Sequence, residues 1–593
     1  MHKKILFGLL ALVTAAMSLL TACTSDSTST SSQISSVSTS AAAAAPSATA
    51  AKTTAQANWW DKFGTPQYGG DITWSTNNLT PNFDTLSFIG LNTSLWFQAP
   101  LFFPDWTLDR SIWSMKGDFT PDQYFTGNVA ESWELTDQQT LTAHLRKGVT
   151  WQNKAPVNGR EFTAYDVQAH FEREMNPDSG SMFAGMLSSW NSVTATDNYT
   201  VVFKFKTPCG ATAFQSVQDL ASVFEAPEAV KAEGGKLADW TKAVGAGPWM
   251  LTGFTAGTSM TYSKNPTYWG YDPRYPQNQV PYADTLTLLA IPDFTTRMAA
   301  LRTAKIDYLD GLDWQQTKTL SSSNPDLQNS PGSIGTGAGV VFRLDKAPFT
   351  DINVRKALNM AINREAIAKG LYGGNAIASP TGWISQAYTG YAYDYADWSQ
   401  TLKDEYTYNP TAAKKLLADA GYPNGFNTNV VTASTINQGA FQTPLNVLET
   451  FKSYFSEIGV EMEIKAMDST VMETYLREGK HDQMASQGGG ATFPPTRSID
   501  QWYSKGSDAG KSMVNDSVYD ELRTKFWAAS TASEAAQICV EADKHIVEQH
   551  WGVWIMEADT YDFWQPYLKG YSNESTNSGI IWSRLWIDQS LKK

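Results

Sequence analysis

The segment from Leu445 to Ile464, LNVLETFKSYFSEIGVEMEI, decides the fold class of this 593-residue chain. Apolar side chains recur at helical spacing as far as Ile458, and Gly459 ends that pattern, so the first part is predicted to be an amphipathic helix. From Val460 onward apolar and charged side chains alternate, which is typical of a strand. A helix that leads directly into a strand indicates an α/β protein.

Segments farther out in the chain predict the same mixture. The predicted strands are residues 68–74, which begin with a turn, and residues 200–205; the predicted helices are residues 353–369 and 410–420. Asp351 or Asn353 is expected to cap the first helix, and Gly421 to end the second. No short-period repeat is obvious, so a repeat protein is not expected.

The chain is acidic and rich in aromatic residues. It has 45 Lys and Arg against 59 Asp and Glu, a formal charge of −14, and 22 tryptophans. The acidic balance argues against nucleic acid as the main partner, because binding phosphates needs clustered basic side chains. Three cysteines are too few for a disulfide scaffold, and Cys209 and Cys539 are either paired or buried as free thiols.

The first residues are typical of a secretion signal. Two lysines precede an apolar stretch at residues 5–20 that is too short for a transmembrane helix, and residues 20–23 read Leu-Thr-Ala-Cys. This tetrapeptide resembles a bacterial lipobox, whose cysteine is lipidated and becomes the new N-terminus. We therefore expect a lipoprotein signal peptide at residues 1–22, a lipid on Cys23, and a Ser/Thr/Ala-rich tether at residues 23–58 that holds the folded part near the outer face of a membrane. An ordinary signal peptide with a chance cysteine is the alternative.

Seven segments, in sequence order, resemble the family-5 extracytoplasmic solute-binding proteins of ABC importers, the dipeptide- and oligopeptide-binding type. They are NVAESWE (128–134), LRKGVTW (145–151), EFTAYDV (161–167), VGAGPW (244–249), KNPTYWG (264–270), APFTD (347–351) with VRKALNMAINR (354–364), and YNPTAAKKLLADAG (408–421). Most of these segments are interpreted as scaffold. They therefore indicate the family and not the ligand.

The resemblance implies a two-lobed periplasmic-binding-protein fold of class II (cluster C) type, with an inserted subdomain and a cleft that closes by hinge motion. The implied divisions are lobe I at residues 68–100, 196–339 and 553–593, the inserted subdomain at residues 101–195, and lobe II at residues 340–552. It also implies a monomer that captures a small solute and delivers it to a separate permease with its ATPase subunits. Neither catalysis nor a cofactor is expected.

The solute is open between a peptide and an oligosaccharide. In peptide-binding relatives, an aspartate in the segment that corresponds to residues 482–502 pairs with the α-ammonium group of the peptide. Here no carboxylate lies between Gly488 and Arg497, and a buried ammonium group without a counter-charge is costly, so the peptide interpretation is weakened. The candidate ligand contacts in this segment are Gly490, Thr492 and Phe493.

The supply of tryptophan favours an oligosaccharide, because sugar rings have apolar faces that stack on indole rings. Packing in the core is the alternative for any single tryptophan, and it is the expected role of Trp582 and Trp586. The candidate ligand contacts in loops are Trp383, Trp502 and Tyr503, and those just beyond the first strand are Asn77, Asn78 and Asp84.

Arg343 stands where the family usually has asparagine, and it is a further candidate contact. Near a hinge, its guanidinium group can bind a carboxylate or phosphate of the ligand. An internal salt bridge is the alternative, and it is the one that we favour.

The enzyme alternative is a secreted glycoside hydrolase, which needs two carboxylates that face each other across a sugar. The sequence alone cannot pair the 59 acidic residues, and the ordered family segments argue against this class. The segment GSDAGKS (506–512) misses the spacing of a phosphate-binding loop, and His545 and His550 lack the spacing of a two-histidine metal site. We therefore expect no metal and no catalytic residue.

Overall fold

The computed structural model describes residues 58–79, 82–115, 119–181, 183, 187–220, 223–331, 337–434, 443–487, 494–506, 509–555, 558, 560–572 and 578–592. The expected signal peptide, Cys23 and nearly all of the expected tether lie outside these residues. In the part of the chain that the structure describes, no helix is both long enough and apolar enough to cross a membrane.

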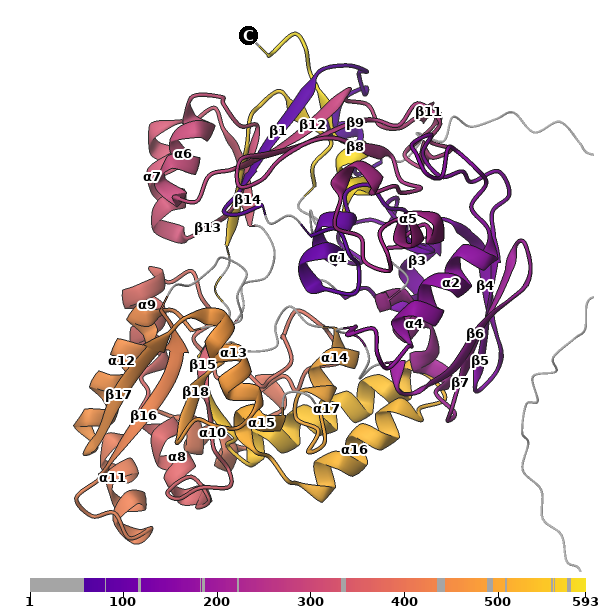
Figure 1. Ribbon diagram of the computed structural model, residues 1–593. Helices are drawn as coiled ribbons and strands as arrows, with labels where there is room; N and C mark the ends of the chain where they lie inside the picture. Colours follow the sequence, from indigo (N-terminus) through magenta and orange to yellow (C-terminus); the bar gives the residue numbers. More distant parts are fainter. Residues whose placement is uncertain are drawn as a thin grey trace, which may run out of the picture. The chain divides into compact units, whose positions relative to one another are not determined.

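A mixed seven-stranded sheet joins segments from both ends of the chain (Figure 1). Its strands, in spatial order, are β14 (Gln328–Pro331), β20 (Tyr561–Trp564), β13 (Tyr308–Leu312), β1 (Asp71–Thr76), β12 (Thr285–Ala290), β9 (Ser259–Lys264) and β8 (Trp249–Thr255). The central strand β1 runs parallel to β12 and β13, whereas the outer pairs are antiparallel. Parallel neighbours that lie so far apart in sequence need long crossover connections, which here contain other parts of the fold.

A five-stranded sheet is built from the second half of the chain. Its strands, in spatial order, are β17 (Val460–Met467), β16 (Phe426–Ala433), β18 (Met484–Ser486), β15 (Ala338–Phe342) and β19 (Gly552–Ile555). β16 is parallel to both β17 and β18, and β15 is antiparallel to β18 and β19. The helix α12 (Leu445–Glu457) connects β16 to β17, as a parallel pair requires.

A four-stranded antiparallel sheet and three two-stranded ribbons complete the strands of the described residues. The sheet consists of β4 (Ala130–Asp137), β5 (Thr140–Leu145), β7 (Thr200–Phe205) and β6 (Trp190–Asp197). The ribbons pair β2 (Phe102–Pro104) with β3 (Phe125–Gly127), β10 (Tyr271–Asp272) with β11 (Tyr275–Gln279), and β21 (Leu568–Lys569) with β22 (Trp586–Ile587).

Helices alternate with these strands. In the first half of the chain they are α1 (Phe88–Ser94), α2 (Ala164–Glu174), α4 (Ala213–Leu220), α5 (Pro227–Ala232), α6 (Phe294–Arg302) and α7 (Trp314–Ser323). Later helices are α8 (Ile352–Met360), α9 (Arg364–Tyr372), α10 (Gln400–Tyr406), α11 (Pro410–Asp419), α13 (Ser469–Arg477), α14 (Pro495–Asp500), α15 (Ala509–Ser512), α16 (Ser517–Trp527), α17 (Ala532–Glu548) and α18 (Gly579–Ser583). The predicted α/β class is confirmed.

The five-stranded sheet is buried on both faces, which explains the unbroken apolar run in β15. Val340 and Phe342 join one cluster with α8, α11 and α12, whereas Val341 joins a second cluster with α13, α16 and α17. Trp554 of β19 belongs to the second cluster. Successive side chains of a strand point to opposite faces, so one short strand serves both clusters.

Most predicted elements are confirmed, and one is wrong. The predicted helix at residues 353–369 is two helices, α8 and α9, because the side chain of Asn363 accepts a hydrogen bond from the backbone of Ala366 and starts a new helix. Asp351 caps α8 as expected. The strand at residues 200–205 and the helices at residues 410–420 and 445–458 agree with β7, α11 and α12 within one residue at each end.

Three of the expected boundaries between lobes and subdomain fall inside strands. The boundary at 195/196 lies inside β6, and those at 339/340 and 552/553 lie inside β15 and β19. The four-stranded sheet therefore extends to residue 205, and the five-stranded sheet takes residues 338–342 and 552–555 as whole strands.

The two cysteines of the folded part were expected to be either paired or free, and in the structure they are free thiols. Cys209 and Cys539 are both buried and unpaired, and burial raises the pKa of the Cys209 thiol to about 12. Trp582 and Trp586 are core residues, as expected from their place in an apolar run.

Candidate functional site

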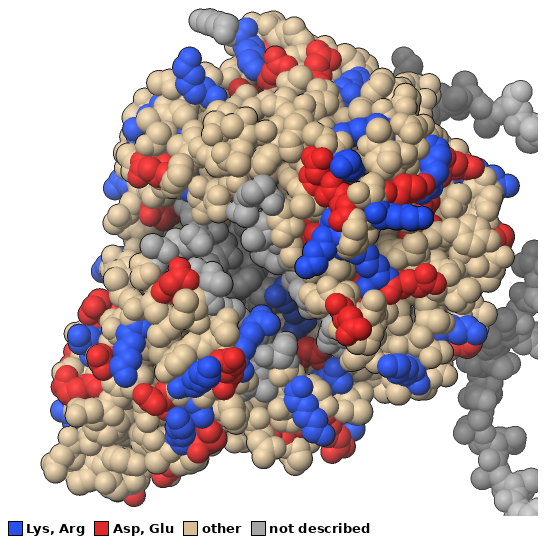
Figure 2. Space-filling view, in the orientation of Figure 1, with Lys and Arg blue, Asp and Glu red and all other residues tan. Residues whose placement is uncertain are grey.

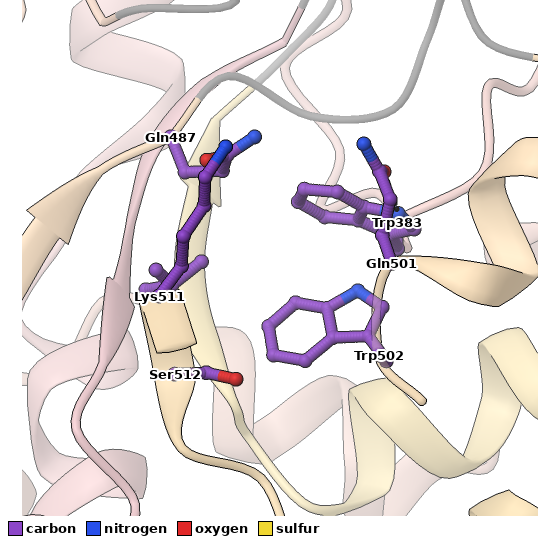
Figure 3. Close-up of a pocket in the computed structure, with 7 residues that line it drawn as sticks. Trp383, Gln487, Gln501, Trp502, Lys511 and Ser512 are labelled. Atoms are coloured by element: carbon purple, nitrogen blue, oxygen red, sulfur yellow. Dashed lines mark hydrogen bonds between the residues drawn. The ribbon is translucent and has the colours of Figure 1, made fainter. Parts of the chain in front are cut away.

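A pocket opens on the α17 side of the five-stranded sheet, where β18 ends (Figure 3). Its lining residues are Val341, Trp383, Gln487, Gln501, Trp502, Lys511 and Ser512. Its volume of about 20 Å³ holds one group of about the size of a water molecule. Loops at the carboxyl ends of strands are the usual place for ligands in α/β proteins, and Gln487 is the first residue after β18.

Trp383 is held in the pocket wall by a buried carboxylate. Its backbone N–H donates to Oδ1 of Asp543 at 2.7 Å, and the N–H groups of Ile384 and Tyr393 donate to the same carboxylate at 3.1 and 2.9 Å. Asp543 lies on the buried face of α17, and burial raises the pKa of its carboxyl group to about 6 against the lowering effect of these three bonds. The loop therefore takes its position from one side chain.

Trp502 lies two residues beyond the end of α14 and contributes an indole N–H group. Its side chain is 3% exposed, and its indole N–H has no hydrogen-bond partner among the described residues. Figure 3 shows the ring edge that carries this nitrogen turned toward Trp383. The two rings meet edge to face with centroids 5.2 Å apart, and Trp502 also packs against Trp551 and Trp554 at 5.1 and 5.9 Å.

Gln501 has a defined orientation. The Nε1–H group of Trp383 donates to its Oε1 at 3.0 Å, and because an indole nitrogen can only donate, the atom that faces it must be the amide oxygen. The amide NH2 group of Gln501 therefore remains as a donor beside the pocket.

The opposite wall carries Gln487, Lys511 and Ser512, which Figure 3 places across the space from the two indoles. α15, the short helix that contains Lys511 and Ser512, is fixed through its backbone. The carbonyl of Lys511 accepts a hydrogen bond from Nε2 of His481 at 2.9 Å, and the carbonyl of Ser512 accepts one from the N–H of Leu344 at 2.8 Å.

Arg343 supports this wall and is 3% exposed. Its guanidinium group forms a bidentate ion pair with Asp345, with two N–O distances of 2.7 Å, and donates to the carbonyl oxygens of Gly479 and His481. The favoured internal salt bridge is thus present. Burial and the nearby Arg343 charge lower the pKa of the His481 imidazole to about 4, so this ring is neutral and donates through Nε2.

The candidates beyond the first strand lie away from this pocket. Asp84 forms an ion pair with Arg173 at 2.6 Å and accepts a hydrogen bond from the backbone of Leu237 at 3.2 Å. Asn77 is half-buried and Asn78 exposed at the end of β1. The structure therefore brings Trp383 and Trp502 together and leaves these three residues outside the pocket lining.

The remaining candidates have different outcomes. Tyr503 is half-buried and lies under the guanidinium group of Arg523, 4.5 Å from the ring centroid, rather than in the pocket. Gly490, Thr492 and Phe493 lie outside the described residues.

Five lining residues were not predicted from the sequence: Val341 and four polar residues. Lys511 and Ser512 lie in the segment GSDAGKS, which was judged only against the phosphate-loop pattern, and Gln487 and Gln501 are adjacent to segments that already held candidates. The sequence feature that could have identified the polar lining residues is their position in loops close to strand ends and to other candidates.

A second hollow, of about 530 Å³, lies on the outer face of α12 and is lined by Glu449, Lys452, Ser453, Ser456, Glu457 and Glu461. All of these side chains are exposed, so it is a solvated surface. No group of three His, Cys, Asp or Glu side chains with the spacing of a metal site occurs among the described residues.

Charges of both signs are mixed on the face shown in Figure 2. Lys and Arg alternate there with Asp and Glu instead of forming a basic stripe. This face agrees with the sequence argument against a nucleic-acid surface.

Relatives and solved structures point to one family. The chain is 27% identical over 480 residues to Heme-binding protein A of Haemophilus influenzae, covering 75% of this chain and 81% of that protein. It is 27% identical over 343 residues to the glutathione-binding protein GsiB of Escherichia coli, covering 58% of this chain and 61% of that protein, so it spans less than two thirds of GsiB.

The fold is similar to that of two-lobed periplasmic binding proteins. The Helicobacter pylori protein DppA, an ABC transporter-associated periplasmic binding protein in complex with the peptide STSA, superposes with a TM-score of 0.71 at 21% identity over 88% of this chain and 99% of that chain. A dipeptide-binding protein from Pseudoalteromonas in complex with Met-Leu superposes with a TM-score of 0.68 at 20% identity, over 88% of this chain and 100% of that chain. The two-lobed fold expected from the sequence is therefore confirmed.

Residues 125–510 match the family described as "Bacterial extracellular solute-binding proteins, family 5 Middle". This range is more than half of the chain and contains five of the seven residues that line the pocket. The chain belongs to the family-5 bacterial extracellular solute-binding proteins.

Proposed function

We propose that this protein is the membrane-anchored, extracytoplasmic solute-binding subunit of an ABC importer, held to the membrane through a lipid on Cys23. It captures a peptide-like solute by closure of its two lobes and delivers the solute to a permease driven by ATPase subunits. The family match over residues 125–510 carries this proposal.

The lobes follow from the sheets. In this proposal lobe I contains the seven-stranded sheet, the inserted subdomain contains the four-stranded sheet, and lobe II contains the five-stranded sheet with the pocket. We assign β15 and β19 wholly to lobe II, because they pair within the five-stranded sheet; in this proposal the chain crosses between lobes just before residue 338 and just after residue 555.

Two observations favour a peptide over an oligosaccharide. Trp383 and Trp502 are only 2% and 3% exposed and pack edge to face against each other, which leaves no open indole face on which a sugar ring can stack. The named ligands of similar proteins also include glutathione, the peptide STSA and the dipeptide Met-Leu. An oligosaccharide remains the second candidate because of the polar amides that line the pocket.

A glycoside hydrolase gains no support from this site. No Asp or Glu is among the described residues that line the pocket, whereas hydrolysis of a sugar bond needs a facing pair of carboxyl groups. Incubation with a panel of oligosaccharides that released shorter products would favour the hydrolase.

Native mass spectrometry of the purified protein tests the proposal. We expect one small solute per chain, and its mass and fragmentation identify it as a peptide or an oligosaccharide. A protein that carries no solute, and that binds neither a defined library of short peptides nor a panel of oligosaccharides after partial unfolding and refolding, would contradict it.

A further inference from the structure

Two side chains from the part of the molecule that holds the four-stranded sheet contact lobe II. Phe119, in the loop between β2 and β3, is 3% exposed and packs edge to face against Tyr388 and Tyr391, with ring centroids 5.4 and 4.9 Å apart. On α4, the carboxylate of Asp219 accepts a hydrogen bond at 3.0 Å from the hydroxyl group of Thr496 on α14. We call these two contacts together the latch.

The elements that carry Phe119 and Asp219 are fixed to the four-stranded sheet. Phe102 of β2 and Phe214 of α4 pack against each other with centroids 5.0 Å apart. Both also pack against Trp133 of β4, at 4.8 and 4.9 Å. Since close-packed side chains resist displacement, β2 and α4 move with this sheet as one body.

The segments of lobe II that receive the latch are the two that carry the indole walls of the pocket. The loop that receives Phe119 also contains Trp383, and α14, which carries Thr496, ends two residues before Trp502. Phe119, Trp383 and Trp502 belong to one buried cluster of side chains. Because close-packed side chains transmit displacement, the latch acts on both indoles.

The latch lies away from the points where the chain crosses between the lobes. In the proposed arrangement, these crossings join β14 to β15 and β19 to β20. The bridge between Ala376 and Ala558 places the chain just beyond α9 beside the second crossing, and Figure 1 shows α9 and α14 at opposite sides of lobe II. Contacts far from a hinge move most when lobes rotate, so the latch has to part before the cleft can open.

We propose that the latch holds the lobes closed around the bound solute and sets the rate at which the solute leaves. Phe119 and Thr496 are then positioning residues, which act on the solute through Trp383 and Trp502. This inference rests on the proposed solute-binding function and names residues that control it. Opening exposes the ring of Phe119 to water, whereas Thr496 exchanges one hydrogen bond for another, so the ring contributes more to the closed state.

The test uses the solute that co-purifies with the full chain as its probe. Loaded protein is exchanged rapidly into solute-free buffer, and native mass spectrometry follows the fraction that keeps the solute, which gives the dissociation rate. Stopped-flow tryptophan fluorescence with the released solute and the stripped chain gives the association rate. Chemical denaturation checks that each variant is folded.

We expect Phe119→Ala to increase the dissociation rate about 10-fold or more and to change the association rate by less than about 3-fold, because the lost contact exists only in the closed state. Phe119→Leu keeps an apolar side chain and should stay within about 3-fold of the wild-type rate. Thr496→Val keeps the shape but removes the hydroxyl donor, and it should increase the dissociation rate about 3-fold.

Two matched controls change contacts that stay within one lobe. Phe254→Ala removes an edge-to-face contact with Phe83, at 5.5 Å, inside lobe I. Thr450→Val removes a hydroxyl group that donates to the carbonyl of Asn446 on the exposed side of α12. Both variants should release the solute at the wild-type rate.

Three outcomes overturn the inference. A wild-type dissociation rate in folded Phe119→Ala would show that the latch does not hold the lobes closed, and the proposed function would stand. Release from Phe254→Ala as fast as from Phe119→Ala would mean that any loss of packing speeds release. If no solute co-purifies, and the folded protein binds neither the peptide library nor the oligosaccharide panel, the proposed function itself fails, and the inference with it.

Discussion

Trp383 and Trp502 differ from most other tryptophans in the sequence only by their places in predicted loops. The structure buries both side chains, which form walls of a small pocket rather than open faces on which a ring could stack. Loop position could therefore predict which indoles lie at the site. It could not predict their exposure, which depends on contacts with Trp551 and Trp554 from distant segments.

Asp543 is the side chain that we expect to matter most for the shape of the pocket. Asp543→Ala removes the acceptor of three buried backbone N–H groups and should lower the free energy of unfolding by about 2–4 kcal/mol, measured by chemical denaturation. Asp419→Ala, which breaks only an exposed pair with Lys415, is the control and should cost less than about 0.5 kcal/mol. Equal effects of the two substitutions would show that Asp543 does not hold the loop.

The low pKa of the His481 imidazole predicts that the free energy of unfolding depends on pH. Its pKa is about 4 in the folded protein and about 6.5 in an unfolded chain, so between these values the unfolded state binds more protons. The stability that the neutral His481 side chain contributes is therefore fully present above about pH 6.5, and it is lost as the pH falls toward 4. A second proton would place near the charge of Arg343 a buried Nδ1–H that has no partner in the part of the chain that the structure describes.

Comparison with His481→Gln isolates this effect. Burial raises the pKa of Asp122, Asp543 and Asp562 to about 6, and these groups act in the opposite direction, since their contribution falls as the pH rises from about 4 to 6. Between pH 7.5 and 4.5, the wild type should lose roughly 2 kcal/mol more than the variant, measured by urea denaturation. The same loss in both proteins would mean that His481 titrates normally.

At the scale of elements, pattern predicts most helices and strands but not the break between α8 and α9. The apolar spacing continues through residues 353–369, and only Asn363, a good N-cap, signals the interruption. The pairing of β15 with β19 could not be predicted either, because more than 200 residues separate the two strands.

Glycines on β15 and β19 make room for the indole of Trp554. A Cβ atom on Gly339 would lie 2.6 Å from Trp554 Cδ1, and one on Gly552 would lie 2.7 Å from Trp554 Cζ2 and 2.5 Å from the carbonyl oxygen of Val340. These two strands therefore approach closely only because both positions lack a side chain.

Gly552→Ala should therefore displace Trp554 and lower the free energy of unfolding by about 1–3 kcal/mol, with weaker near-ultraviolet circular dichroism from the packed indoles. Gly370→Ala, in α9 and with open space around the new methyl group, is the matched control and should stabilise the protein by about 0.5–1 kcal/mol. A neutral Gly552→Ala substitution would show that the strands can separate without cost.

At the scale of the whole molecule, the fold was predictable from ordered family segments and not from periodicity. The seven-stranded sheet places β1 and β20 on either side of β13, although they come from opposite ends of the chain. A local sequence pattern cannot predict the spatial order of strands that lie so far apart in the chain, whereas a family resemblance implies that order. The solute was not predictable in the same way, because its recognition depends on a few side chains such as Trp383 and Trp502, whose exposure is set by packing between distant segments.

Calorimetric titration of the ligand-stripped full chain with the solute released from the purified protein tests the central claim most directly. We predict saturable binding of one solute per chain, after which the solute is recovered chemically unchanged, as a capture protein requires. Failure to bind the released solute, or its recovery as cleaved products, would contradict the assignment of this chain as the binding subunit of an importer.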